Sequence, residues 1–288
     1  MKLVTFLSNG ACKIGALVGD AIVAADDSLP NDMIGFLAAG VEARRALQAL
    51  IDGGAPRLAL ADVTLLAPIP RPGKLLGIGL NYADHINETG WEKPEYPTFF
   101  TKQSTCVIGP DAAIHIPPIS DKVDYEGELA FVIGKRCKYV GVENARDVIA
   151  GYTICNDVTV RDWQARTPTW TLGKSFDSHG PLGPWLVTAD EIADPHNLTL
   201  KTWVGGELRQ NANTGEMIFN CYEMVAYLTQ AMTLEPGDVI TTGTPAGVGV
   251  KMKPRGYLKP GQTVRIEIEG LGALSNPVIT EPPENLGM

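Results

Sequence analysis

The chain has 288 residues, 44% of them hydrophobic, with a net charge of −9 and a pI near 5.0. This length allows a substantial core, in one large domain or a large domain with a smaller one. The acidic balance and the scattered basic residues argue against a nucleic-acid-binding surface. No apolar run approaches the roughly 18 residues of a membrane span, and the N-terminal apolar stretch is too short for a signal peptide. We therefore expect a cytoplasmic protein without nucleic-acid or membrane partners.

The cysteines are odd in number and widely spaced, and no two form a Cys-x-x-Cys pair. This pattern is typical of reduced thiols rather than of a disulfide framework or a zinc site. No cysteine has a neighbour in sequence that would act as its base, so a catalytic cysteine is unsupported.

Residues 1–67 predict a small N-terminal α+β domain. Short strands alternate there with one helical segment, 41–51, which ends at the Gly53-Gly54 break. Residues 68–73, Pro-Ile-Pro-Arg-Pro-Gly, contain alternating prolines, which fix φ and remove backbone donors. We expect this stretch to be a stiff linker to the main domain, 74–288.

The main domain is rich in short strand-like runs separated by glycine and proline. Its helical segments are 144–149, which is short, and 221–232, where Asn220 and Glu223 form an N-cap and acidic third position. Many strands and few helices favour a β-dominated α+β fold over a parallel βαβ sheet. The expected strands are 74–78, 113–116, 129–134, 151–155, 198–204, 238–242 and 263–268.

Glu126 and Glu128 lie one residue apart in the otherwise apolar run 125–133. Alternate residues of a strand point to the same face, so the two carboxylates share a face. Apolar residues on both faces predict a strand that is covered on both sides. Two like charges at such a site either share a proton or hold a cation. The alternative is a solvated strand end with two acids of no special role.

Asp157 follows the strand-like run 151–155 and is a candidate third ligand for a cation held by Glu126 and Glu128. Three carboxylates without His or Cys nearby favour a hard divalent ion, Mg²⁺ or Mn²⁺, with Ca²⁺ as an alternative. Spacing alone leaves open that Asp157 only caps a turn.

Other segments also carry candidate residues. His85 and Glu88 lie three residues apart, so on one helical turn the carboxylate can orient the imidazole as a general base. Lys174 lies in a glycine-marked, aromatic-flanked stretch that suits an anionic substrate or a developing enolate. Thr244 lies in the glycine-rich loop 241–249, whose N–H groups can cradle a carboxylate. The alternatives are an incidental surface contact, an exposed loop lysine and a tight turn, respectively.

Motifs in a shared order make the chain resemble the fumarylacetoacetate hydrolase family over about residues 73–278. The resemblance implies a mixed β-sandwich roll, a homodimer and a Mg²⁺ or Mn²⁺ site. The most similar members act on acylpyruvates, diketo acids and oxaloacetate. The motifs are Gly-Leu-Asn-Tyr with the His85 and Glu88 turn, Glu126-Gly127-Glu128, Asn-Asp-Val-Thr at 156–159 with Arg-Asp-Trp-Gln at 161–164, Thr-Leu-Gly-Lys-Ser-Phe-Asp at 171–177, and Gly-Asp-Val-Ile-Thr-Thr-Gly-Thr-Pro at 237–245.

The resemblance also implies roles for single residues. Glu126, Glu128 and Asp157 become the metal ligands. His85 and Glu88 become a pair that activates water, on a segment that closes as a lid in the family.

The resemblance makes Lys174 the cationic partner of the substrate or of its oxyanion. Further positions fall where relatives hold the carboxylate and keto groups of the substrate, which we expect to be a small anionic keto acid. These positions are Lys102, Arg161, Gln164 and Thr244.

The expected activity is metal-dependent hydrolysis of a C–C bond in a 2,4-diketo acid or acylpyruvate, which gives a 2-keto acid and a carboxylate. The same pocket can protonate or decarboxylate an enolisable keto acid without water. An oxaloacetate decarboxylase, a keto–enol tautomerase or a sugar-acid lyase is therefore the alternative. A binding protein without turnover is a third class, and the retention of every motif residue argues against it.

Overall fold

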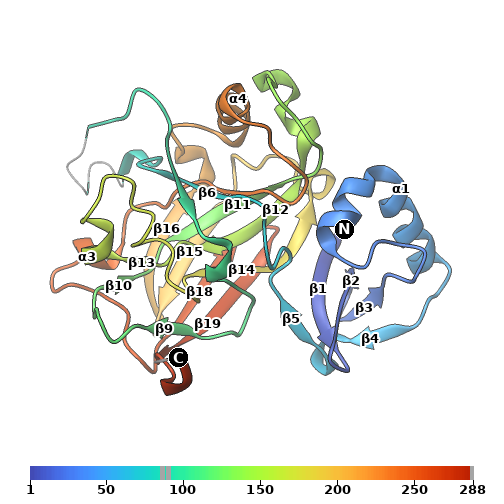
Figure 1. Cartoon of the computed structure of the whole chain (residues 1–288), viewed down its shortest axis with the longest axis horizontal. Coiled ribbons are helices and arrows are strands. Elements are labelled where there is room, and N and C mark those ends of the chain that lie inside the picture. Colours follow the sequence, from blue (N-terminus) through green and yellow to red (C-terminus); the bar gives the residue numbers. More distant parts are fainter. Residues whose placement is uncertain (85–87, 89–91, 286–288) are drawn as a thin grey trace.

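The computed structural model describes residues 1–84, 88 and 92–285, and strands dominate them (Figure 1). They form one large mixed sheet, one smaller sheet and a short pair. The predicted β-dominated α+β fold is therefore confirmed. The strands of the large sheet are β1 (Lys2–Ser8), β2 (Ala11–Val18), β3 (Ala21–Ala24), β4 (Arg57–Ala59), β5 (Thr64–Leu66), β6 (Leu75–Gly79), β7 (Thr98–Lys102), β8 (Val107–Ile108), β11 (Gly127–Ile133), β12 (Ile149–Asn156), β14 (Gly180–Thr188) and β17 (Val239–Thr241).

The large sheet connects the N-terminal strands to those that carry the acidic motifs. Its order is β4-β3-β2-β1-β14-β12-β11-β17-β6-β7, with β5 paired to β1 and β8 to β14. Most neighbours are antiparallel, whereas β17 pairs in parallel with β6. The runs predicted as strands at 74–78, 129–134, 151–155 and 238–242 are present as β6, β11, β12 and β17, with bounds shifted by a few residues.

The smaller sheet packs against the middle of the large one, and a hydrophobic core fills the space between them. Its order is β16-β15-β18-β19-β9. Contacts join β15, β18 and β19 to β11, β12 and β14. Its strands are β9 (Ile114–Ile116), β15 (Thr199–Val204), β16 (Glu207–Asn213), β18 (Thr263–Ile268) and β19 (Gly272–Thr280), and the short pair is β10 (Val123–Asp124) with β13 (Thr159–Val160).

β11 is buried along its whole length, as its apolar run predicted. Phe131 belongs to the core shared with the smaller sheet, and Val132 to a second core that includes residues of the N-terminal helix. Glu128 continues the alternation of Val132, so it points away from the smaller sheet. Gly127, between the two glutamates, faces that sheet, and a Cβ there would lie 2.2 Å from Thr202 Oγ1. Only glycine therefore fits between the acids.

Helices are few and lie outside the sheets (Figure 1). The predicted cap of α4 is confirmed: Asn220 Oδ1 accepts the Glu223 N–H, and the Asn220 N–H donates to Glu223 Oε2 at 2.8 Å. The segment predicted as a helix at 144–149 is the 3₁₀ helix η3. In the described part of the chain, no helix is both long and apolar enough to cross a membrane. The helices are α1 (Met33–Asp52), α3 (Arg161–Gln164) and α4 (Cys221–Ala231), and the 3₁₀ helices are η1 (Leu60–Asp62), η2 (Ser104–Cys106), η3 (Val142–Val148), η4 (Ala189–Glu191), η5 (Thr214–Glu216), η6 (Gly249–Lys251) and η7 (Pro283–Asn285).

The N-terminal helix begins earlier than the predicted segment 41–51. Asp32 caps α1 by accepting the Gly35 N–H at 2.9 Å. Gly40, with a φ of 66°, breaks the helix near its middle. A helix interrupted in this way has no continuous 3.6-residue pattern, so the sequence predicted only its second half.

The N-terminal segment lies at one end of the molecule and extends the large sheet through the pairing of β1 with β14 (Figure 1). The stretch 68–73 forms no strand or helix. Its first residue is held to β1, because Thr5 Oγ1 donates to the Pro68 carbonyl at 2.8 Å. The division into domains at 67 and 73 stays a prediction.

His179 is fully buried, and this burial makes stability depend on pH. Its Nε2–H donates to the His115 carbonyl at 2.8 Å, its ring stacks on Phe176, and its Nδ1 has no partner within the described residues. Burial lowers the pKa of His179 from 6.5 to about 3. Between these pH values the unfolded chain binds a proton that the native state excludes. The free energy of unfolding should therefore fall as the pH drops below 6.5, by about 1.4 kcal/mol per pH unit.

His179→Gln should remove this dependence, because an amide still donates to the carbonyl but does not titrate. We expect urea denaturation to show a steeper loss of stability from pH 6 to pH 5 in the wild type than in the variant. Parallel profiles would mean that His179 contributes nothing to the acid sensitivity.

Candidate metal and substrate site

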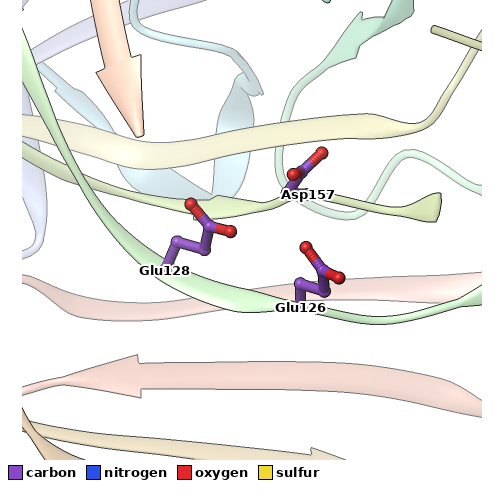
Figure 2. Close-up of side chains that lie close together, drawn as sticks. All are labelled: Glu126, Glu128 and Asp157. Carbon is purple, nitrogen blue, oxygen red and sulfur yellow. The ribbon is translucent and has the colours of Figure 1, made fainter. Parts of the chain in front are cut away.

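Neighbouring strands bring Glu126, Glu128 and Asp157 together (Figure 2). β11 and β12 are antiparallel, with Glu128 opposite Cys155, and the Asp157 N–H donates to the Glu126 carbonyl at 2.9 Å. One carboxylate oxygen from each residue lies within 4.8 Å of the others, and all three residues are buried. The structure thus places the predicted third acid beside the first two, while their role as metal ligands stays a prediction.

Buried basic side chains surround Glu126 and Asp157. Lys174 Nζ lies 2.6 Å from Glu126 Oε2 and 2.5 Å from Asp157 Oδ2. Arg161 Nη1 lies 2.6 Å from Glu126 Oε1, and Lys102 Nζ lies 2.7 Å from Asp157 Oδ1. Both carboxylates are therefore paired with cations from two sides, which offsets the cost of burying their charges.

Glu128 has no such ion pair with any described residue, and it accepts the Gly243 N–H at 2.9 Å. Burial raises the pKa of Glu128 well above its usual range, and the charges of Asp157 and Glu126 raise it further, against the opposing effect of Lys174. A proton or an added cation at Glu128 would therefore stabilise this site. Three carboxylates, one of which needs positive charge, fit a hard divalent cation such as Mg²⁺ or Mn²⁺.

A cavity of about 490 Å³ opens onto Glu126 and Glu128. Arg161 lines this cavity, and its Nη2 is buried without a hydrogen-bond partner within the described residues, which leaves one donor of the guanidinium unsatisfied. The Gln164 side chain is held beside it, because Arg161 Nη1 donates to Gln164 Oε1 at 3.1 Å. Polar residues that line the cavity include Glu126, Glu128, Arg161, Gln164, Lys174 and Thr244.

The glycine-rich loop after β17 borders the cavity through Thr244. Its hydroxyl donates to the Gly127 carbonyl at 3.0 Å and accepts from Gln210 Nε2 at 2.8 Å. The Gly247 N–H of the same loop lies 3.3 Å from both carboxylate oxygens of Glu88. Glu88 therefore lies against the loop that carries Thr244. His85, its predicted partner, lies outside the described residues.

Lys102 lies behind the acids rather than among the described residues that line the cavity. Its side chain is fully buried, and its ammonium donates to Asp157 Oδ1 and to the Lys174 carbonyl. The charge of Asp157 raises the pKa of Lys102 against the opposing effect of burial. Lys102 thus holds one acid and the backbone of Lys174 in place, a position that the sequence did not predict.

Asp124 is a buried acid that we did not select from the sequence. Its Oδ2 accepts from Arg161 Nε at 2.8 Å and from the Val250 N–H at 2.9 Å, and its Oδ1 accepts from the Gly249 N–H at 2.8 Å. Asp124 therefore fixes the Arg161 guanidinium and the turn 249–250 at the same time. The signal was present, because Asp124, Glu126 and Glu128 follow the alternation of a strand.

The sequence of this chain is similar to those of known proteins. Residues 74–279 match the family described as Fumarylacetoacetate (FAA) hydrolase C-terminal. The chain is 44% identical over 288 residues to the mitochondrial oxaloacetate tautomerase fahd2 of Xenopus laevis, a match that covers 97% of this chain and 90% of that protein.

Solved structures agree in fold along the whole chain. A fumarylacetoacetate hydrolase from Exiguobacterium antarcticum matches with a TM-score of 0.88 at 37% identity, over 98% of this chain and 100% of that chain. The maleylpyruvate hydrolase of Sphingobium sp. SYK-6, in complex with manganese(II) and pyruvate, matches with a TM-score of 0.83 at 33% identity, over 98% of this chain and 100% of that chain. The similarity thus extends to a protein that binds manganese and a 2-keto acid.

Proposed function

Because the chain belongs to the fumarylacetoacetate hydrolase family, we propose that it catalyses the keto–enol tautomerisation of oxaloacetate or a similar 2-keto acid. The observation that carries the proposal is the buried acid cluster beside a cavity that Glu126 and Glu128 line together with Arg161 and Lys174. The similarity to an oxaloacetate tautomerase along nearly the whole chain supports the reaction type.

Different residues of the cavity bind different groups of the substrate. The Arg161 guanidinium donates through Nη2 to the substrate carboxylate, and Gln164 beside it offers an amide donor. The Lys174 ammonium stabilises the negative charge that develops on the 2-keto oxygen. A divalent cation, Mg²⁺ or Mn²⁺, held by Glu126, Glu128 and Asp157 would supply further positive charge that favours the enolate form.

Tautomerisation moves protons only: one leaves C3 and another is added to the 2-keto oxygen, so no water is consumed. We assign the removal of the proton at C3 to the pair of His85 and Glu88. The contact of Glu88 with the loop that carries Thr244 supports this assignment, because Thr244 lines the cavity. Lys102 acts as a positioning residue for Asp157 and Lys174 rather than as a substrate ligand.

Hydrolysis of a C–C bond, the activity expected first from the sequence, is the second candidate. The fold shared with the maleylpyruvate hydrolase favours it, and in this reaction Glu88 would act with His85 to activate water. The two reactions differ in whether water attacks the second carbonyl of the substrate.

The test supplies the Mn²⁺-loaded protein with the enol form of oxaloacetate and follows its conversion to the keto form. Acetylpyruvate is supplied in parallel, and NMR identifies the products. Accelerated ketonisation without formation of acetate supports the tautomerase, whereas acetate and pyruvate support the hydrolase. Release of CO₂ from oxaloacetate at the rate of its consumption would replace the proposal with a decarboxylase. Glu128→Gln serves as the control for the metal-free background rate.

Asp124→Asn should weaken substrate binding more than turnover. The amide would present its N–H₂ group either to Arg161 Nε and the Val250 N–H or to the Gly249 N–H, and it would also remove the charge that pairs with the guanidinium. The guanidinium would therefore lose part of what fixes its orientation. We expect KM to rise by about 10- to 100-fold, the usual effect of losing a partner that orients a binding group, with a smaller change in kcat. Asp162→Asn, which alters the residue next to Arg161, is the matched control. A fall in kcat at unchanged KM would contradict positioning of the substrate through Arg161.

A further inference from the structure

The cavity has an aromatic side in addition to the acid cluster and its basic partners. Phe100 on β7 lies opposite Gly77 on β6, and a Cβ at Gly77 would lie 2.3 Å from the Phe100 ring. A Cβ at Gly79 would lie 2.4 Å from the ring of Trp170. Both aromatic rings therefore lie directly on the backbone of β6, and glycine at these positions makes that approach sterically feasible.

The two rings form one continuous wall. Phe100 and Trp170 pack edge to face, with centroids 5.8 Å apart and an interplanar angle of 62°. Both line the cavity, as does Ile78 between the two glycines. Trp170 has a φ of 61°, a conformation that bulky residues rarely adopt, so its backbone is strained where its ring reaches the cavity.

The wall lies at a defined distance from the acids. β17 separates β6 from β11 in the sheet, which places β6 about 10 Å from the strand of Glu128. Lys174 Nζ lies 4.8 Å from the centroid of the Phe100 ring. The polar end of the cavity therefore stops at Phe100, and Trp170 lies beyond it.

The size of the cavity points to a ligand longer than a four-carbon acid. Its volume of about 490 Å³ lies within the range of ~300–1,000 Å³ typical of pockets that bury drug-sized ligands. A keto-acid head bound at Arg161 and Lys174 reaches as far as Phe100 and leaves Trp170 uncovered. On a polar substrate this wall would contribute little, whereas an apolar group would gain by burial against it.

We propose that Phe100 and Trp170 form a subsite for an apolar tail, and that the preferred substrates are 2-keto acids with an alkyl or aryl group beyond the keto carbon. This inference rests on the proposed function, because it takes the acid cluster as the binding site of the keto-acid head. It adds a substrate class that the acid cluster alone does not define.

The test compares two substrates with the same head. Oxaloacetate and phenylpyruvate are both enolisable 2-keto acids, and they differ in whether C3 carries a carboxylate or a phenyl ring. In Trp170→Ala, the ratio of kcat/KM for phenylpyruvate to that for oxaloacetate should fall by at least about tenfold, the scale of losing an apolar pocket contact. Gly79→Ala, whose methyl group displaces the Trp170 ring, should lower the ratio in the same direction.

Leu172→Ala is the matched control, because Leu172 is an exposed residue of the same loop. In this variant, the ratio of kcat/KM for phenylpyruvate to that for oxaloacetate should equal the wild-type ratio. A calorimetric titration of phenylpyruvate and pyruvate into the Mn²⁺-loaded protein tests the subsite without turnover: Trp170→Ala should weaken phenylpyruvate about tenfold more than pyruvate. Equal weakening of both ligands, or an unchanged ratio, overturns the subsite. Selective binding without ketonisation of either substrate overturns the proposed function and leaves the subsite standing.

Discussion

Replacing Glu128 with glutamine is expected to lower turnover by about a thousandfold, the scale of removing one group that stabilises charge in the transition state. Glutamine has the same shape and still accepts the Gly243 N–H. The substitution removes the negative charge that a divalent cation would balance. Calorimetric titration should show the loss of Mn²⁺ binding, while circular dichroism should show an unchanged fold.

The same variant should be more stable than the wild type when a chelator is present. In the folded protein the charge of Glu128 is opposed by burial and by two other acids, so a neutral side chain there removes a cost. We expect the Tm of the variant in EDTA to exceed that of the wild type, and Mn²⁺ to raise only the wild-type value. Glu284→Gln, at an exposed position, is the control. Full activity of the wild type after exhaustive chelation would refute the metal requirement.

The acid cluster could be predicted from the sequence because its geometry is mostly local. Glu126 and Glu128 lie on one strand, where the alternation of side chains fixes their common face. Asp157 directly follows the next strand in the sheet, so one antiparallel pairing brings it to Glu126. The cap of α4 is local in the same sense, since Asn220 and Glu223 lie within one turn.

Features that depend on pairing between strands far apart in the chain could not be predicted from the sequence. β14 lies between β1 and β12 in the middle of the large sheet, although it contains Pro181 and Pro184, and proline is rare in central strands. Its pairing with β12 is irregular between Tyr152 and Ile154, which interrupts the ladder beside the prolines. Lys102 belongs to a strand whose partners are known only from the fold, so its contact with Asp157 was not predictable from spacing.

Replacing Lys174 with methionine should have opposite effects on metal binding and on catalysis. The ammonium lies within 2.6 Å of Glu126 and Asp157, in a side chain that is 3% exposed. Without it, the two carboxylates still have Arg161 at Glu126 Oε1 and Lys102 at Asp157 Oδ1 as ion-pair partners. The removal of one partner from a buried ion pair typically costs about 3–5 kcal/mol of stability. We expect a loss at the low end of this range in EDTA, because the remaining two cations still offset part of the charge.

A divalent cation should restore much of this stability, because it supplies positive charge to the same carboxylates. Its affinity should rise, since a neighbouring ammonium that repels it is gone, while turnover should fall about a hundredfold for lack of the charge beside the 2-keto oxygen. Calorimetric titration with Mn²⁺ and thermal denaturation with and without metal measure the two effects, with Lys259→Met, at an exposed position, as the control. If metal affinity falls together with activity, Lys174 helps to build the metal site instead of balancing its charge. Under the proposed function, Lys174 is therefore the residue that distinguishes metal binding from catalysis, because its ammonium would repel a cation at the acids and attract the negative charge of the reacting keto acid.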